Sequence, residues 1–148
     1  MENLKEVQIL IVEDNPHDAE MAMRAFKKNN LANNILVVND GQAALDYLFA
    51  QGKYAEIGEL QRPKMILLDL KLPKISGLEV LKEVKANPKT KLIPVIMLTS
   101  SKEEEDIIES YQLGVNSYIV KPVDFEKFVD AVKELGLYWL VLNQYPYD

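Results

Sequence analysis

The chain has 148 residues, of which 48% are hydrophobic and 27% are charged, and this composition is typical of one globular domain with its own core. The formal net charge of −6 argues against direct binding to nucleic acid. The absence of cysteine excludes disulfide scaffolds, thiolate zinc sites and cysteine nucleophiles and favours a cytoplasmic location, while the short apolar runs argue against a membrane protein.

Short apolar runs alternate with helical patterns along the chain. Residues 7–12 form a nearly continuous apolar run that ends at Glu13, which is typical of a strand buried on both faces of a parallel sheet. Pro16 then suits the first turn of a helix. The same alternation predicts further strands at residues 35–38, 65–68, 93–98 and 117–120.

Helices are expected after the strands, because apolar residues recur there at helical spacing. Their apolar faces include Ala19, Met23 and Phe26; Ala44, Leu45, Leu48 and Phe49; Leu78, Leu81 and Val84; and Phe125, Phe128, Val129 and Val132. A further helix is expected over residues 102–113, and the last helix is expected to continue through Trp139 and Leu140. This alternation predicts an α/β fold, a doubly wound five-stranded parallel sheet of flavodoxin-like order 2-1-3-4-5.

Polar side chains follow four of these strands. Glu13 and Asp14 follow the first strand, and Asp69 follows the third. Thr99 follows the fourth strand, and Lys121 follows the fifth. Ligands of open α/β sheets bind at the carboxyl ends of the strands, so we expect these side chains to share one rim. A single aspartate after a strand is more often a turn former, and the convergence of four strand ends is what favours a site.

The chemistry of this rim points to a hard metal ion and phosphate. Clustered carboxylates repel each other unless a cation lies between them, and oxygen ligands without thiol or imidazole favour Mg²⁺. A carboxylate beside such a metal can attack phosphorus and form an acyl phosphate. The sequence therefore predicts phosphoryl transfer to Asp69, with Lys121 neutralising the phosphoryl oxygens and the Thr99 hydroxyl binding one of them.

These residues resemble the receiver domain of two-component response regulators. The similarity is carried by Ile9-Leu-Ile-Val-Glu13-Asp14-Asn15, Ile66-Leu-Leu-Asp69-Leu-Lys-Leu-Pro73, Gly77-Leu78, Pro94-Val-Ile-Met-Leu-Thr99-Ser100, Gly114 and Tyr118-Ile-Val-Lys121-Pro122. The resemblance implies that Asp69 accepts phosphate from a sensor histidine kinase. It also implies that the chain is a cytoplasmic signalling switch and not an enzyme of metabolism.

The resemblance further implies roles for single residues. Thr99 and Tyr118 match the switch pair of the family, in which the hydroxyl moves toward the phosphate while the aromatic ring turns inward. Asn15 would begin the loop over the site and cap the first helix. The implied ligands of Mg²⁺ are Asp14, Asp69, the backbone carbonyl of Lys71 and, through water, Glu13.

A narrower similarity is to the single-domain regulators that partner phytochrome-type histidine kinases, because of the long link at residues 52–63 and the aromatic tail. Residues 1–136 would form the receiver domain and residues 137–148 an aromatic extension. We expect a homodimer through the last helix and this tail; an extension folded back on its own domain is the alternative. The candidate interface residues are Tyr138, Trp139, Tyr145 and Tyr147.

Two other functions are compatible with a doubly wound parallel sheet, but particular residues of this sequence disfavour each of them. Phosphatases of the haloacid dehalogenase type also use a strand-end aspartate with Mg²⁺, but they need a second aspartate where Lys71 stands. A flavin-binding module would need a loop rich in Ser, Thr or Gly after the first strand. Glu13 and Asp14 stand there instead and would repel phosphate in the absence of a metal.

Overall fold

The computed structural model contains a five-stranded parallel sheet, which confirms the predicted fold class. The structure describes residues 4, 6–30, 34–121 and 124–136. The strands are β1 (Ile9–Val12), β2 (Ile35–Val38), β3 (Met65–Leu68), β4 (Val95–Thr99) and β5 (Ser117–Val120). Their order in the sheet is β2-β1-β3-β4-β5, and each neighbouring pair is parallel.

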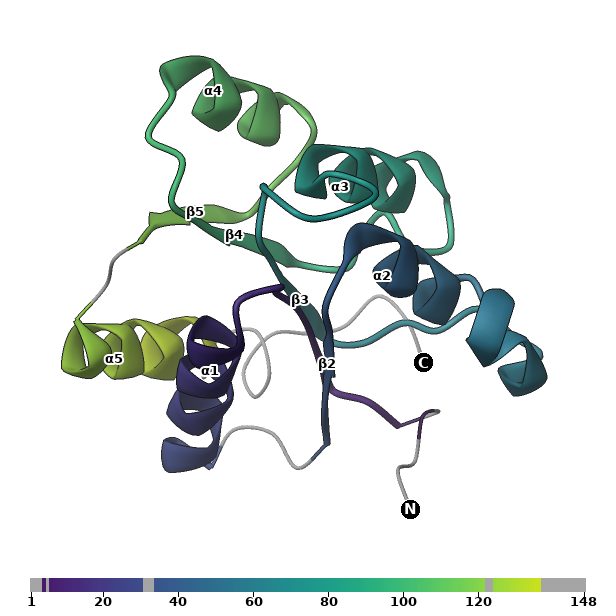
Figure 1. Ribbon diagram of the computed structural model, residues 1–148, viewed down its shortest axis with the longest axis horizontal. Helices are drawn as coiled ribbons and strands as arrows, with labels where there is room; N and C mark the ends of the chain where they lie inside the picture. Colours follow the sequence, from purple (N-terminus) through teal and green to yellow (C-terminus); the bar gives the residue numbers. More distant parts are fainter. Residues whose placement is uncertain (1–3, 5, 31–33, 122–123, 137–148) are drawn as a thin grey trace.

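Helices cover both faces of the sheet (Figure 1). They are α1 (Pro16–Lys28), α2 (Gly41–Leu48), α3 (Gly77–Ala86), α4 (Glu104–Gln112) and α5 (Phe125–Gly136), with the 3-10 helix η1 (Gly52–Ile57) after α2. α1 and α5 lie on one face, whereas α2, α3 and α4 lie on the other. In the described part of the chain, no helix is both long enough and apolar enough to span a bilayer.

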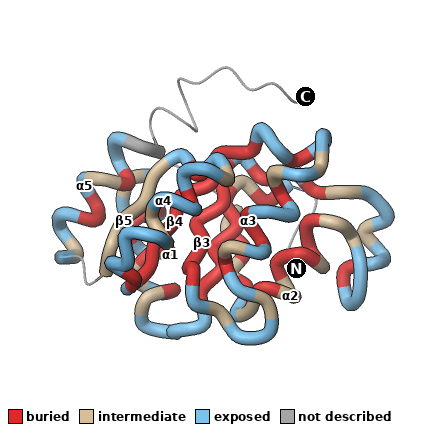
Figure 2. The backbone as a smooth tube through the Cα atoms, turned by 90° about the horizontal axis from the view of Figure 1, so that it is seen from above, coloured by how far each residue is buried: buried red, intermediate tan, exposed pale blue. Residues whose placement is uncertain are grey.

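The central strands are buried on both faces and contribute to two hydrophobic clusters. In β1, Leu10 and Val12 pack into the cluster with α2 and α3, whereas Ile9 and Ile11 pack into the cluster with α1 and α5. Side chains of β3 and β4 divide between the clusters in the same alternating way, because successive residues of a strand point to opposite faces. Figure 2 shows these strands as the buried centre of the molecule.

Several element boundaries differ from those that the sequence predicts. A strand is predicted over residues 93–98, but β4 runs from Val95 to Thr99, because Thr99 pairs with Val120 and so extends the ladder with β5. β1 begins at Ile9 although the buried apolar run begins at Val7. The helix predicted over residues 102–113 is α4, which is shorter at both ends.

The link after α2 is more ordered than its polar composition predicts. Within it, η1 buries the ring of Tyr54 edge-on against Tyr47, with the ring centroids 5.4 Å apart. The Tyr47 hydroxyl in turn donates a hydrogen bond to the carbonyl of Leu4 at 2.7 Å. The link is therefore part of the packed domain.

The aromatic extension lies outside the described residues. α5 is described as far as Gly136, so the expected continuation of this helix stays a prediction. The same holds for the division of the chain at residue 136 and for the interface. The interface residues concerned are Tyr138, Trp139, Tyr145 and Tyr147.

Two glycines allow helix N-termini to pack directly against the segment that follows β3. A Cβ atom at Gly77 would overlap the carbonyl oxygen of Asp69 and lie 2.6 Å from Cα of Leu70. A Cβ atom at Gly41 would overlap the carbonyl oxygen of Ile75. The backbone of α2 and α3 therefore fixes the path of the segment that carries Asp69.

We predict that Gly77→Ala destabilises the protein, because the added methyl group forces the backbone at Asp69 to shift. The free energy of unfolding, measured by urea denaturation, should fall by about 1–3 kcal/mol. Lys82→Ala, at an exposed position of the same helix, should change it by less than about 0.5 kcal/mol. Equal effects of the two substitutions would contradict the close approach at Gly77.

Candidate functional site

The carboxyl ends of the strands bring the predicted site residues to one edge of the sheet. Val12 of β1 pairs with Leu68 of β3, and Thr99 of β4 pairs with Val120 of β5. The residues that follow three of these strands therefore leave the sheet at the same edge. They are Glu13, Asp69 and Lys121.

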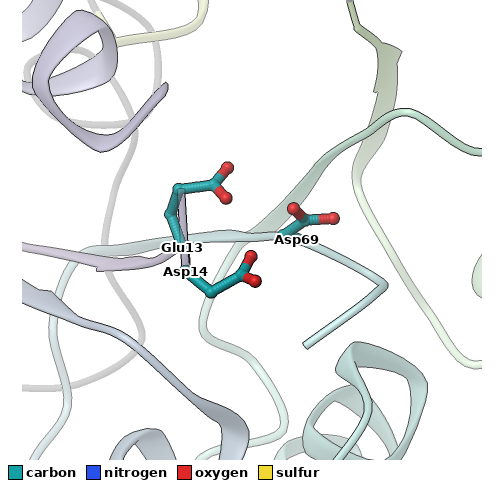
Figure 3. Close-up of side chains that lie close together, drawn as sticks. All are labelled: Glu13, Asp14 and Asp69. Atoms are coloured by element: carbon teal, nitrogen blue, oxygen red, sulfur yellow. The ribbon is translucent and has the colours of Figure 1, made fainter. Parts of the chain in front are cut away.

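Three carboxylates form a compact acidic cluster at this edge. Figure 3 shows Glu13 and Asp14, at the end of β1, with their carboxylates near that of Asp69. One oxygen from each residue lies within 4.8 Å of the others. The Glu13 and Asp69 side chains are buried, whereas Asp14 is exposed. Clustered carboxylate oxygens are the donor set that a hard divalent cation prefers, so these residues fit Mg²⁺ or a similar ion.

Asn15 joins the acidic cluster to the first helix. Its Oδ1 accepts hydrogen bonds from the N–H groups of His17 at 2.9 Å and Asp18 at 3.2 Å, which makes it the N-cap of α1 as predicted. Its own N–H donates to Oε2 of Glu13 at 3.1 Å. The same turn therefore starts the helix and orients one of the clustered carboxylates.

Lys121 inserts its ammonium group among the carboxylates. Its Nζ lies 2.6 Å from Oε1 of Glu13 and 3.1 Å from Oδ2 of Asp69. A third ion pair, at 2.8 Å, joins it to Oδ2 of Asp18 in the first turn of α1. An ammonium group has three N–H donors, so these three carboxylates match its donor capacity.

Burial and charge shift the pKa values of this cluster. Burial raises the pKa of Glu13 to about 7, against the lowering effect of the Lys121 ammonium and the Asn15 N–H, and the nearby Asp69 charge adds to the rise. For Lys121, burial acts to lower the pKa, but hydrogen bonds to the surrounding carboxylates raise it above its ordinary value. The lysine therefore stays protonated, and Glu13 can hold a proton near neutral pH when no metal is bound.

Asp69 lines an open cavity of about 400 Å³. Its Oδ1 accepts a hydrogen bond from the N–H of Lys71 at 3.2 Å, and its Oδ2 contacts Lys121, so both oxygens are oriented. The cavity is lined by Glu13, Asn15, Asp18, Asp69, Lys71, Ser100 and Lys121. It gives a small anionic group access to an aspartate that is only 7% exposed.

Thr99 and Tyr118 are connected through Ser101. The Oγ1 of fully buried Thr99 accepts a hydrogen bond from the Ser101 N–H at 3.4 Å, and the Tyr118 hydroxyl donates to the Ser101 carbonyl at 3.1 Å. The Ser101 hydroxyl donates to Oδ2 of Asp106, in the first turn of α4, at 2.6 Å. Both predicted switch residues are thus linked to the start of α4.

The structure brings most of the predicted site residues together and adds two that the sequence analysis missed. Glu13, Asp14, Asp69 and Lys121 meet at one edge, and the Lys71 backbone contacts Asp69 through its N–H. The missed residues are Asp18 and Ser101. Asp18 lies four positions after Asp14 and Ser101 two positions after Thr99, but ordinary cap and turn residues share this spacing, so it does not identify either residue as part of a site.

Comparisons with known proteins agree on one family. Residues 9–133 match the model of the response regulator receiver domain. The chain is 43% identical over 138 residues to the probable methanogenesis regulatory protein FilR2 of Methanothrix harundinacea, covering 93% of this chain and 86% of FilR2. It is 40% identical over 132 residues to the response regulator Rcp1 of Synechocystis, covering 89% of this chain and 88% of Rcp1.

Solved structures give the same picture. The Mn²⁺-bound form of Rcp1 is 38% identical, with a TM-score of 0.82 and coverage of 94% of this chain and 98% of that one. The phosphorylated cyanobacterial phytochrome response regulator RcpA is also 38% identical, with a TM-score of 0.84 and coverage of 96% and 99%. The bacteriophytochrome response regulator RtBRR is 50% identical, with a TM-score of 0.76 and coverage of 95% and 84%.

The raised pKa of Glu13 predicts how stability depends on pH in the metal-free protein. Because the folded state holds this proton more tightly, its stabilising effect is fully present below about pH 4.5 and is lost as the pH rises through about 7. Relative to Glu13→Gln, the parent protein should lose about 1–3 kcal/mol of unfolding free energy between about pH 5 and pH 8. Urea denaturation in EDTA measures this loss.

The control is Glu20→Gln, which makes the same change at an exposed position of α1 and should follow the parent curve. Parallel curves for the parent protein and Glu13→Gln would show that Glu13 does not hold the proton.

Proposed function

This chain belongs to the family of response regulator receiver domains, and from that membership we propose that it is a phosphorylation switch that receives a phosphoryl group on Asp69 from a sensor histidine kinase. Rcp1 and FilR2 each match this chain over more than four-fifths of their length, which supports a regulator built on the receiver domain alone. In this proposal the output is a change in a protein–protein interaction surface.

The observation that carries the proposal is the setting of the Asp69 carboxylate. It is buried and lines an open cavity, with one oxygen held by the Lys71 N–H and the other facing the Lys121 ammonium. In the proposed reaction an oxygen of ionised Asp69 attacks the phosphorus of a phosphohistidine. The phosphorus–nitrogen bond breaks, and its electron pair leaves with the imidazole.

Lys121 and Thr99 would bind the transferred group. The Lys121 ammonium already lies 3.1 Å from Asp69, where it would neutralise phosphoryl oxygens through charge-assisted hydrogen bonds. The Thr99 hydroxyl lies at the end of the neighbouring strand and would donate to one phosphoryl oxygen. The same hydroxyl accepts a hydrogen bond from the Ser101 N–H, so a shift of Thr99 toward the phosphoryl group would reach Tyr118 and α4 through Ser101.

Mg²⁺ is the proposed cofactor. The ligands would be Asp14, Asp69, the backbone carbonyl of Lys71 and, through water, Glu13. Bound Mg²⁺ would offset the negative charge of the phosphoryl oxygens. The similarity to the Mn²⁺-bound form of Rcp1 supports a divalent ion, and the clustered carboxylate oxygens of this chain support a hard ion.

The chain fits a signalling switch that phosphorylates and dephosphorylates its own aspartate better than it fits an enzyme of metabolism. Lys71 stands where a haloacid dehalogenase-type phosphatase needs an acid, and Glu13 with Asp14 would repel a flavin phosphate. The family match over residues 9–133 is to the receiver domain and to neither alternative. A cytoplasmic location is part of the same proposal.

The proposed partners are a histidine kinase and a second copy of this chain. RcpA and RtBRR are named as phytochrome and bacteriophytochrome response regulators, which supports a kinase of the phytochrome type. The acidic net charge of −6 makes nucleic acid an unfavourable direct partner. The aromatic tail supports a homodimer through the last helix and residues 137–148, because aromatic residues are enriched in interfaces.

Incubation with a small acyl phosphate and Mg²⁺ should add one phosphoryl group to the protein, as measured by intact mass. We predict that Asp69→Asn and EDTA each abolish the adduct, because one removes the attacking oxygen and the other removes the metal. Asp130→Asn, which changes an exposed aspartate on α5, should leave the adduct unchanged. An unmodified parent protein would refute phosphorylation at this site.

Sedimentation velocity tests the homodimer. The full chain should sediment as a dimer, and a chain ending at Gly136 should sediment as a monomer, because the shorter chain lacks Tyr138, Trp139, Tyr145 and Tyr147. Trp139→Ala in the full chain should weaken the dimer by about tenfold or more, as expected for a central aromatic of an interface. A monomeric full chain, or an unaffected truncated dimer, would contradict this role of the tail.

A further inference from the structure

A fourth carboxylate, that of Asp18, lies beside Lys121. Its Oδ2 is 2.8 Å from the Lys121 Nζ, closer than the 3.1 Å that separates Asp69 from the same atom. Asp18 comes from the first turn of α1 and lines the same cavity as Asp69. It stands outside the cluster of Glu13, Asp14 and Asp69, whose oxygens are close enough together to hold a metal ion.

Lys121 and a divalent cation would compete for the same carboxylates. Lys121 donates hydrogen bonds to Glu13 and Asp69, and both residues belong to the metal-binding cluster. Two positive charges in a largely buried site repel each other strongly. An ammonium that stays in the site therefore needs a carboxylate outside the cluster. Within the described parts of the chain, Asp18 is the carboxylate that forms an ion pair with Lys121 and meets this condition.

We propose that Asp18 is a positioning residue, which retains the Lys121 ammonium beside Asp69 when a divalent cation takes over Glu13 and Asp69. This inference rests on the proposed function and assigns a role that the receiver motifs described above leave open. Asp18 lowers the competition between the two cations, and the affinity for the divalent ion consequently depends on Asp18 acting through Lys121.

Asp18 is well placed for this role. Its N–H donates to Oδ1 of the capping Asn15, which fixes the backbone at Asp18 in the first turn of α1. Its side chain is 31% exposed and that of Lys121 is 12% exposed, so water screens the pair only in part. Apart from Glu13, Asp18 and Asp69, the residues that border the small space between these carboxylates are apolar, so they offer the ammonium no other charged partner. They include Ile11, Ala22 and Leu98.

The test is a double-mutant cycle on Mg²⁺ binding, measured by isothermal titration calorimetry of the full chain. The four proteins are the parent, Asp18→Asn, Lys121→Gln and the double variant. Asp18→Asn alone should raise the Kd for Mg²⁺ by about fivefold, because the freed ammonium returns to Glu13 and Asp69. With Lys121→Gln already present, Asp18→Asn should change the Kd by less than about twofold.

The outcomes separate this role from the proposed function. If Asp18→Asn weakens Mg²⁺ binding equally in both backgrounds, Asp18 acts on the cation directly and the proposal is overturned. The proposal is also overturned if Asp18→Asn leaves the Kd for Mg²⁺ of the otherwise unchanged protein as it was. Asp18→Glu should recover part of the affinity, because it restores a carboxylate that can reach Lys121. Thermal unfolding in EDTA verifies that each variant folds. If Asp18→Asn does not fold, Asp18→Ser replaces it in the cycle. A parent protein that binds no Mg²⁺ would instead refute the metal site itself.

Discussion

The whole site is organised around one ammonium group held between carboxylates from distant parts of the chain. Lys121 is 108 residues from Glu13, 103 from Asp18 and 52 from Asp69 in the sequence. In the sheet, β4 separates β5 from β3, so the backbones that carry Lys121 and Asp69 are about 10 Å apart. A long side chain is required to cross that distance, and the stem of a lysine can do so while its charged end finds polar partners.

This contact explains why the order of the strands matters for the chemistry. The order β2-β1-β3-β4-β5 makes β1 and β3 neighbours, which brings Glu13 and Asp14 next to Asp69. The close packing at Gly77 and Gly41 then fixes the segment after β3, and the Asn15 cap fixes the segment after β1. The order of the strands therefore brings the carboxylates close together, while the helix N-termini fix the backbone segments that carry them.

Much of this arrangement can be predicted from the sequence, because continuous apolar runs such as those of β1 and β3 identify buried parallel strands and their polar ends identify the rim. Asp18 could not be assigned in this way, since an acid in the first turn of a helix is common whether or not it has a distant partner. The burial of Tyr54 was missed for a similar reason, because it depends on the ring of Tyr47 and not on a local pattern. The last residue of β4 depends likewise on its pairing with Val120.

The depth of Asp69 has a consequence for what can reach it. A carboxylate that is only 7% exposed and lines a cavity of about 400 Å³ offers little surface for a flat partner to contact. In the proposed function, a donor would have to carry its phosphoryl group on a projecting side chain or be a small free molecule. The same cavity is open to water, so the opening that would admit a phosphoryl donor would also admit the water that hydrolyses the acyl phosphate. Residues that line this cavity, Lys71 and Ser100 among them, would accordingly influence both the phosphorylation of Asp69 and the lifetime of its acyl phosphate.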